Sequence, residues 1–197
     1  MENRYTQILP APNRAGGQTL VFNNRPAVAS MAAIAGEMEG QGTFGDHFDT
    51  VLTDDLWGEE TWEKAESKMF EEVVRKALSK ENLAETWVEC LVGGDLLNQI
   101  IAANFAARQL GLPFLGLYGA CSTMAESLLV GSVLVSGGFM SCVACAVTSH
   151  FCTAERQYRM PLEMGTQRTP TAQRTVTGAG CTILVGQGSG AAKGIEI

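Results

Sequence analysis

The sequence predicts an α/β fold of three layers, in which helices cover both faces of a mostly parallel sheet. Short apolar runs of strand character alternate with segments of helical periodicity along most of the 197 residues. With 46% hydrophobic and 18% charged residues, the composition is typical of a globular domain. The run from Pro113 to Ala120 is almost wholly apolar, as expected of a parallel strand that is covered on both faces.

Composition and charge exclude several classes of protein. The net charge of −7 and the pI of about 4.9 argue against nucleic-acid binding, which needs a basic surface. The longest apolar stretch, from Met124 to Met140, is interrupted by Glu126 and is too short to span a bilayer. No apolar run follows the polar start of the chain, so we expect no secretory signal. A soluble protein is therefore expected.

In the first half of the chain, the clearest element is a helix from Thr61 to Ser79. Its apolar residues recur at helical spacing and its charged residues occupy the other face. Before it we expect an N-terminal arm over residues 1–18, strands over 19–22 and 27–34 separated by Pro26, and a Gly- and acid-rich loop over 35–60. A strand from Thr86 to Val92 follows the helix.

The second half is more apolar. We expect a helix over 96–110 that closes at Gly111, the strand over 113–120, and an apolar helix from Cys121 to about Val135. Buried strands are predicted over 141–148 and 178–185. The intervening residues 149–177 form a long polar loop, and a loop of that length is usually functional or lies at an interface.

Three chemically active side chains follow consecutive predicted strands. Asp95 follows the second strand, Cys121 the third and His150 the fourth. Ligands of open α/β sheets bind beyond the carboxyl ends of the strands. If these strands are parallel, the three side chains lie at one edge of the sheet, where Ser122 would join them.

Cys121 is the most informative of these residues. A thiol where a buried strand turns into a helix lies near free N–H groups, which lower its pKa and favour the nucleophilic thiolate. The alternative is a small buried residue at a tight turn. His150 is a candidate proton acceptor for Cys121, and its alternative is a structural or surface role.

The arginines of the long loop, Arg156, Arg159 and Arg168, are candidates for holding an anion, because a guanidinium matches carboxylate geometry. A solvated or subunit-facing loop is the alternative. Glu126 stands alone among apolar neighbours and is expected to take a backbone or arginine partner. Cys142 and Cys145 spell C-x-x-C, but on a strand positions three apart face opposite sides. We therefore expect neither a metal site nor a cofactor.

Separated motifs, in order along the chain, resemble those of one family. They are residues 93–99 (GGDLLNQ), 113–123 (PFLGLYGACST), 153–157 (TAERQ), and 170–173 with 175–180 (PTAQ and TVTGAG). The family is the stage V sporulation protein AD family of endospore-forming bacteria, and the resemblance covers the chain from about Thr19 onward. It implies a thiolase-like fold in which residues 19–197 form the N-terminal half. This half has a five-stranded sheet whose last strand is antiparallel, and its pseudo-symmetric sister half is absent from this chain.

The resemblance also implies a function. Members are thought to bind dipicolinic acid and to take part in moving it, with calcium, into the developing spore. They act beside the other stage V A proteins, which are membrane proteins, without catalysis. The alternative is an acyltransferase of the thiolase type, because Cys121 matches the thiolase nucleophile; a purely structural subunit is a third possibility. A half-domain would expose apolar surface around the Cys121 helix, which predicts a homo-oligomer or a longer polypeptide.

Overall fold

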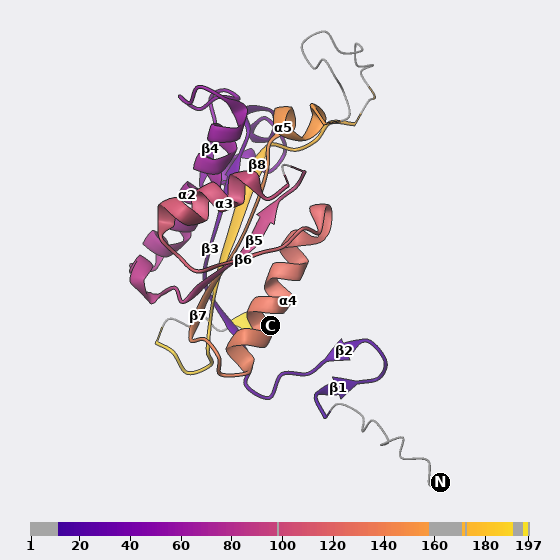
Figure 1. The fold of residues 1–197 in the computed structure, drawn as a ribbon, viewed down its shortest axis with the longest axis vertical. Coiled ribbons are helices and arrows are strands. Elements are labelled where there is room, and N and C mark those ends of the chain that lie inside the picture. Colours follow the sequence, from indigo (N-terminus) through magenta and orange to yellow (C-terminus); the bar gives the residue numbers. More distant parts are fainter. Residues whose placement is uncertain (1–11, 98, 158–170, 172, 191–194, 197) are drawn as a thin grey trace, which may run out of the picture.

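A computed structural model of the chain describes residues 12–97, 99–157, 171, 173–190 and 195–196 (Figure 1). Its main sheet has the strand order β4-β3-β8-β7-β5-β6. The strands are β3 (Ala27–Ala35), β4 (Thr50–Val51), β5 (Cys90–Asp95), β6 (Phe114–Gly116), β7 (Cys142–Ser149) and β8 (Gly178–Val185). A further short strand, β9 (Ile195–Glu196), pairs with β3.

The direction of the strands follows the predicted pattern. β5 is parallel to both β6 and β7, and β4 is parallel to β3. β8 is antiparallel to its two neighbours, β3 and β7. The five expected strands are therefore β3, β8, β7, β5 and β6, with β8 the reversed one. The short strands β4 and β9 extend the sheet at β3.

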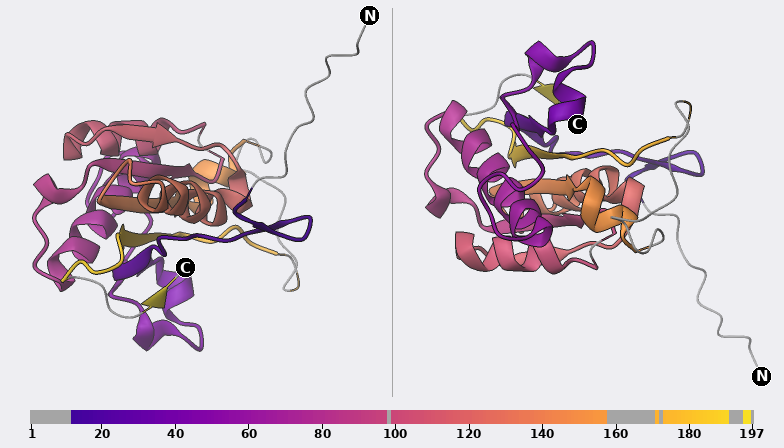
Figure 2. Two further views of the ribbon diagram at one scale, coloured as in Figure 1. Left: turned by 90° about the horizontal axis from the view of Figure 1, so that it is seen from below. Right: turned by 90° about the horizontal axis from the view of Figure 1, so that it is seen from above.

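Helices cover both faces, which confirms the three-layer α/β/α prediction (Figure 2). On one face, α2 (Trp62–Lys80) and α3 (Ile101–Leu110) pack on the sheet through a core that includes Phe70, Val73 and Ile183. On the other face, α4 (Thr123–Ser136) packs through a smaller core that includes Val135 and Leu184. Helix α2 begins where predicted, because the Thr61 hydroxyl accepts a hydrogen bond from the Lys64 N–H at 3.3 Å.

The C-x-x-C pair lies as the strand geometry requires. Cys142 belongs to the core beneath α2, whereas Cys145 belongs to the core beneath α4 and its thiol donates to the Ser127 carbonyl oxygen at 3.2 Å. Burial raises the pKa of Cys142 to about 11 and that of Cys145 to about 12. The two thiols therefore face opposite sides of β7 and stay protonated.

The predicted strand over 113–120 is the main correction. The strand β6 spans only Phe114–Gly116 and is the outer edge of the sheet, where Leu115 is 43% exposed. The expectation that both faces of this strand are covered is wrong, because the side chain of Leu115 and the residue Gly116 are exposed and Phe114 is only half-buried. The apolar composition of this segment resembles that of a buried strand. Composition alone does not distinguish an edge strand from a central strand of a sheet.

Other element boundaries shift by several residues. Residues Glu85–Trp87 form a 3₁₀ turn (η2), so that β5 starts at Cys90 and reaches Asp95. Helix α3 starts only at Ile101, because Gln99 and Ile100 adopt left-handed backbone angles, and it ends at Gly111 as predicted. The 35–60 loop contains the short helix α1 (Glu37–Gly40), the 3₁₀ turn η1 (Gly45–His47) and β4. The 149–177 loop begins with α5 (Phe151–Glu155), and residues 158–170 and 172 lie outside the described part.

The N-terminal arm, as far as the structure describes it, is an exposed hairpin. β1 (Arg14–Ala15) and β2 (Thr19–Leu20) pair antiparallel with each other and not with the main sheet. The predicted strand over 19–22 is thus part of the arm. Residues 1–11 of the predicted arm lie outside the described residues.

Helix α4 is only half covered, although its composition is apolar nearly all round. Its inner side, with Ser127, Gly131 and Val135, is buried against the sheet, whereas Leu129 is 49% and Val133 43% exposed. An apolar surface around the Cys121 helix is what a half-domain is expected to expose. Among the described helices, none has the length and apolar character needed to cross a membrane.

Candidate functional site

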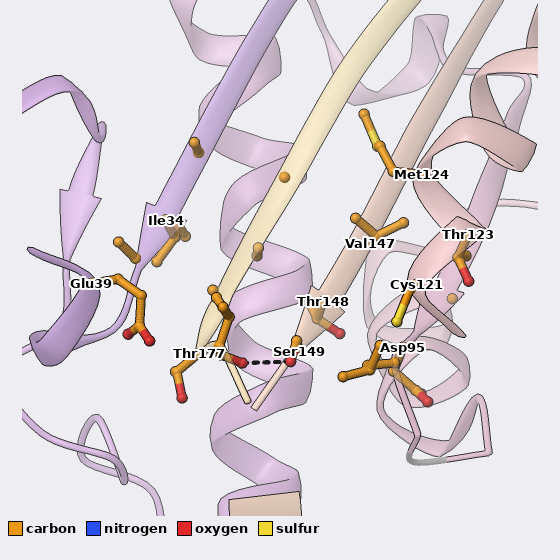
Figure 3. A pocket seen from close by; sticks show the side chains of 18 of the residues that line it. Ile34, Glu39, Asp95, Cys121, Thr123, Met124, Val147, Thr148, Ser149 and Thr177 are labelled. Atoms are coloured by element: carbon orange, nitrogen blue, oxygen red, sulfur yellow. Dashed lines mark hydrogen bonds between the residues drawn. The ribbon is translucent and has the colours of Figure 1, made fainter. Parts of the chain in front are cut away.

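A cavity of about 310 Å³ lies at the sheet edge where β3, β5 and β7 end and β8 begins (Figure 3). Asp95 and Ser149 are the last residues of β5 and β7, and Thr177 precedes β8. The wall toward α4 consists of Ala120, Cys121, Thr123 and Met124. This is the edge at which the parallel strands were predicted to place a site.

Cys121 lies on the rim of this cavity. It is the middle residue of the 3₁₀ turn η3 (Ala120–Ser122), directly before α4, and it is the one exposed thiol of the chain's six. The turn places the thiol at the start of a helix, where N–H groups have no intrahelical acceptor. The structure therefore places Cys121 at a helix start beside a cavity, as the sequence predicted, and not in a buried turn.

Asp95 lines the same cavity, but its carboxylate also has structural contacts. It is fully buried and accepts hydrogen bonds from the N–H groups of Ile100, at 3.0 Å, and Ala103, at 3.4 Å. These bonds hold the start of α3 against the end of β5. The Asp95 side chain thus shapes the cavity wall while it caps a helix.

His150 follows β7 at the same edge, but its ring is turned away from the cavity. The imidazole is fully buried, its Nδ1 accepts a hydrogen bond from the Cys152 N–H at 3.2 Å, and its Nε2 lies 2.7 Å from the Asp55 carbonyl oxygen. Because Nδ1 accepts, Nε2 carries the proton and donates to Asp55. Burial lowers the pKa of His150, so the ring is neutral. Neither histidine of the chain lines the cavity, and the Cys121–His150 pair is not brought together.

Ser122 and Glu126 form a pair outside the cavity lining. The Ser122 hydroxyl is exposed and contacts both the Gly119 carbonyl oxygen and the Glu126 carboxylate. A Cβ at Gly119 would displace the Glu126 carboxylate from this position. Glu126 therefore takes a serine partner one helical turn away, where a backbone or arginine partner was expected.

The loop arginines do not line the cavity as far as the structure describes them. Arg156 forms an ion pair with Glu63, and its guanidinium lies 5.9 Å from the centre of the Trp62 ring. Arg174 lies over the Phe151 ring at 3.9 Å. Arg159 and Arg168, the other candidate anion ligands, lie outside the described residues.

Sequence reasoning missed Glu39, which comes from α1 and forms the wall opposite Cys121. Its Oε2 atom is buried and, within the described residues, has no hydrogen-bond partner. The Gly- and acid-rich composition of residues 35–60 predicts a loop, and only tertiary packing folds α1 back over the end of β3. With Asp95, Glu39 makes the cavity acidic.

A second missed feature is a buried carboxylate under the cavity. Glu66 of α2 is fully buried and accepts hydrogen bonds from the Thr153 hydroxyl at 2.7 Å and from the Thr148 hydroxyl at 3.4 Å. Thr148 in turn lines the cavity. The prediction that the charged residues of this helix lie on its solvent face is therefore wrong for Glu66. Glu66 precedes the buried Met69 and Phe70 by three and four residues, and this helical spacing is the signal that the sequence offers.

Comparison with known proteins supports the fold and a family. The family model for stage V sporulation protein AD matches residues 16–195. Stage V sporulation protein AD of Bacillus subtilis (strain 168) is 43% identical over 169 residues, which cover 86% of this chain and 50% of that protein. The chain thus spans about half the length of the curated relative that it matches.

Solved structures of condensing enzymes share the thiolase-like fold. The priming β-ketosynthase from the R1128 polyketide biosynthetic pathway is 15% identical with a TM-score of 0.54, over 86% of this chain and 53% of that one. The 3-oxoacyl-[acyl-carrier-protein] synthase III from Aquifex aeolicus VF5 is 15% identical with a TM-score of 0.52, over 81% of this chain and 53% of that one. At such low identity, these similarities show the fold alone.

Proposed function

This chain belongs to the stage V sporulation protein AD family, and from that membership and the cavity geometry we propose that it binds dipicolinate without catalysing a reaction. The ligand site is the cavity beyond the ends of β3, β5 and β7. In the developing spore, the protein takes part in dipicolinate uptake beside stage V A membrane proteins, which hold it at the inner spore membrane.

One observation carries the non-enzymatic part of the proposal. Cys121 lines the cavity, but no histidine does. The ring of His150 is instead hydrogen-bonded to main-chain groups of Asp55 and Cys152. A thiol nucleophile needs a proton acceptor within hydrogen-bond reach. The described lining of this chain offers Cys121 no imidazole, which supports binding over acyl transfer for this chain by itself.

The charge of the cavity supports a ligand that arrives with calcium. Glu39 and Asp95 are the charged side chains of the described lining, and one buried oxygen of Glu39 has no hydrogen-bond partner in that part of the chain. A bare dicarboxylate would meet like charges there. Calcium binds carboxylate oxygens, so a calcium chelate of dipicolinate offsets the repulsion and offers Glu39 a cation. In this proposal, calcium arrives bound to dipicolinate and is part of the ligand, not a cofactor of the protein.

Isothermal titration calorimetry of this chain with dipicolinate, with and without calcium chloride, tests the proposal. We expect binding that is stronger with calcium, and weaker binding of isophthalate, which lacks the ring nitrogen. The variant Gly180→Leu fills the cavity, because a side chain at Gly180 meets no atom within 4 Å and Gly180 lines the cavity. Gly186→Leu, beyond the other end of β8 and equally unhindered, is the matched control. The proposal is contradicted if the heat of dipicolinate binding persists in Gly180→Leu. It is also contradicted if neither the parent chain nor the control releases or absorbs heat with dipicolinate.

Acyl transfer is the second candidate, favoured by the exposed Cys121 thiol at a helix start within a thiolase-like fold. Incubation with an acyl thioester followed by mass spectrometry of the intact chain and of its peptides tests it. An adduct on Cys121 without dipicolinate binding would replace the binding proposal with this one. If neither assay responds, a structural subunit becomes the better description.

A further inference from the structure

Beside the cavity, residues 37–51 form a protrusion at the β3 side of the sheet (Figure 2, violet). The protrusion comprises α1, η1 and β4. Its parts pack on one another: a Cβ on Gly40 would collide with the Val51 side chain, and one on Gly45 would collide with the Gly40 carbonyl. Since Glu39 and Phe48 line the cavity, the protrusion also forms part of the cavity wall.

Three apolar side chains of this protrusion are uncovered. Phe44 is 69%, Met38 52% and Val51 40% exposed. The ring centroids of Phe44 and His47 lie 6.2 Å apart, and His47 is itself exposed. A segment that folds back on the sheet and still leaves three large apolar side chains in water offers an interaction surface.

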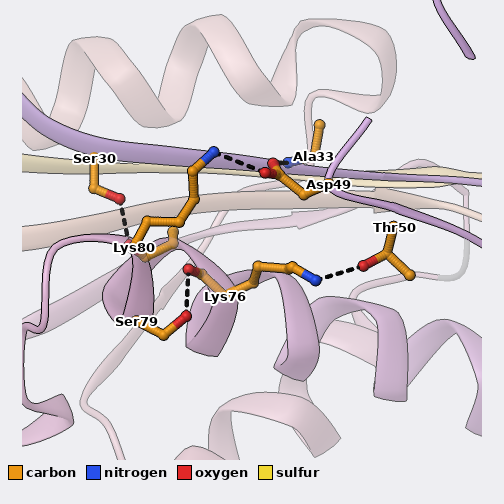
Figure 4. A network of polar contacts seen from close by, with 8 residues as sticks. Ser30, Ala33, Asp49, Thr50, Lys76, Ser79 and Lys80 are labelled. Carbon is orange, nitrogen blue, oxygen red and sulfur yellow. Dashed lines mark hydrogen bonds and ion pairs between the residues drawn. The ribbon is translucent and has the colours of Figure 1, made fainter. Parts of the chain in front are cut away.

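Polar contacts hold the protrusion in place (Figure 4). The Asp49 carboxylate pairs with Lys80 of α2 at 2.7 Å and accepts a hydrogen bond from the Ala33 N–H of β3 at 2.9 Å. Lys76 of α2 donates to the Thr50 hydroxyl at 2.8 Å. The apolar face is therefore anchored to both a helix and the central sheet, and a partner would not have to order it on binding.

The protrusion itself contributes only acidic charge to this face, and the neighbouring basic side chains of α2, Lys76 and Lys80, are bonded to Thr50 and Asp49. From Gly36 to Trp57 the sequence holds six carboxylates and neither lysine nor arginine. Of these, Asp49 is paired with Lys80, whereas within the described residues Glu37 and Asp46 form no ion pair. An acidic surface repels anionic lipid and nucleic acid, and it attracts cationic groups.

We propose that the face made by Met38, Phe44 and Val51 docks a segment of a partner protein in which basic and apolar residues are mixed. Its apolar side chains would cover Met38 and Phe44, and its lysine or arginine side chains would pair with Glu37 and Asp46. Because the same protrusion supplies Glu39 and Phe48 to the cavity, the docked segment lies next to the cavity mouth.

The chain's net charge of −7 disfavours a second copy as the occupant. The exposed hairpin of another copy, which carries Arg14 and the exposed Leu20, is a basic and apolar segment that self-association could offer. Sedimentation velocity, described below, distinguishes a second copy of the chain from a different partner protein.

The probe is a synthetic, fluorescein-labelled peptide of alternating lysine and leucine, titrated with the whole chain and followed by fluorescence anisotropy. A peptide of alternating glutamate and leucine is the control. We expect saturable binding of the lysine peptide that weakens with salt, and no binding of the glutamate peptide.

Two variants and two matched controls locate the site. Phe44→Ser and Asp46→Lys should each weaken peptide binding about fivefold. Phe139→Ser removes another exposed phenylalanine, and Glu72→Lys makes the same charge change on α2; both should bind like the parent chain. Circular dichroism confirms that each variant is folded. Equal affinity of variants and controls, or absence of binding, overturns the proposal.

Sedimentation velocity of the chain alone completes the test. If Phe44→Ser and Asp46→Lys dissociate an oligomer of the parent chain, the occupant is a second copy and the proposed partner is wrong. Dipicolinate calorimetry on the same two variants keeps the two proposals separate. A negative peptide titration contradicts the docking proposal even if dipicolinate still binds. Likewise, absence of dipicolinate binding contradicts the proposed function even if the peptide binds.

Discussion

The Nε2 atom of His150 lies 2.7 Å from the main-chain oxygen of Asp55, and this contact decides the role of the histidine. Asp55 belongs to the loop before α2, so the imidazole fastens that loop to the end of β7. The ring is fully buried, and it is held neutral with its proton on Nε2. The role of His150 is therefore structural: it joins the loop before α2 to the end of β7, two segments far apart in sequence.

The first prediction concerns the stability of the chain at mildly acidic pH. Burial lowers the pKa of His150 below the value of about 6.5 that it has in the unfolded chain. Between these two values the unfolded state binds a proton that the folded state does not, so stability falls as pH decreases below about 6.5. Urea denaturation should show a loss of stability of at most about 1 kcal/mol between pH 6.5 and 5.5, the limit for one proton bound only by the unfolded chain.

The control for this prediction uses both histidines. His150→Asn should flatten the pH dependence in that range, whereas His47→Asn, which changes an exposed ring, should leave it unchanged. A His150→Asn variant with the same slope as the parent chain would show that another group titrates.

The second prediction concerns thiol reactivity. Cys121 is exposed, and burial raises the pKa of the other five thiols, to about 12 for Cys145 and Cys152. An aromatic disulfide reagent at pH 8 should modify one thiol of the folded chain quickly and all six after unfolding in urea. Cys121→Ser should remove the fast phase, and a fast phase that survives in this variant would refute the assignment.

The third prediction concerns the buried Glu66. Its carboxylate accepts a 2.7 Å hydrogen bond from the Thr153 hydroxyl of α5. Thr153→Val keeps the shape but removes the donor, and a buried acceptor that loses a partner costs about 1–3 kcal/mol. Thr153→Ser keeps the donor and should lose less. Chemical denaturation measures both, and equal stability of the two variants would argue against this hydrogen bond.

The fourth prediction concerns the outer face of α4. Leu129 and Val133 are nearly half exposed, and they lie on the side of the helix that points away from the sheet. We expect the chain to self-associate through this face, and the double variant Leu129→Gln/Val133→Gln to reduce the association in sedimentation velocity. Met31→Gln, which changes an exposed methionine of β3, is the control. A parent chain that sediments as a stable monomer would contradict the expectation.

Much of the architecture was predictable because it depends on local patterns. The stripe around Met69 and Val73 predicts α2, and Gly111, with its left-handed backbone, closes α3 as expected. The apolar runs that became β7 and β8 were located to within a residue. The alternation of strands and helices implies parallel strands. Parallel strands place Asp95, Cys121 and His150 at the same edge of the sheet.

The sequence by itself determined the fold class, the family and the position of Cys121 near a strand–helix turn, since each follows from patterns within short segments and from the order of those segments along the chain. Only the tertiary structure decided which side chains share the cavity. Packing turned the His150 ring toward Asp55, brought Glu39 over the end of β3, and left β6 at the edge of the sheet. These outcomes depend on contacts between segments distant in sequence, and neither periodicity nor composition encodes where a side chain points once such segments meet.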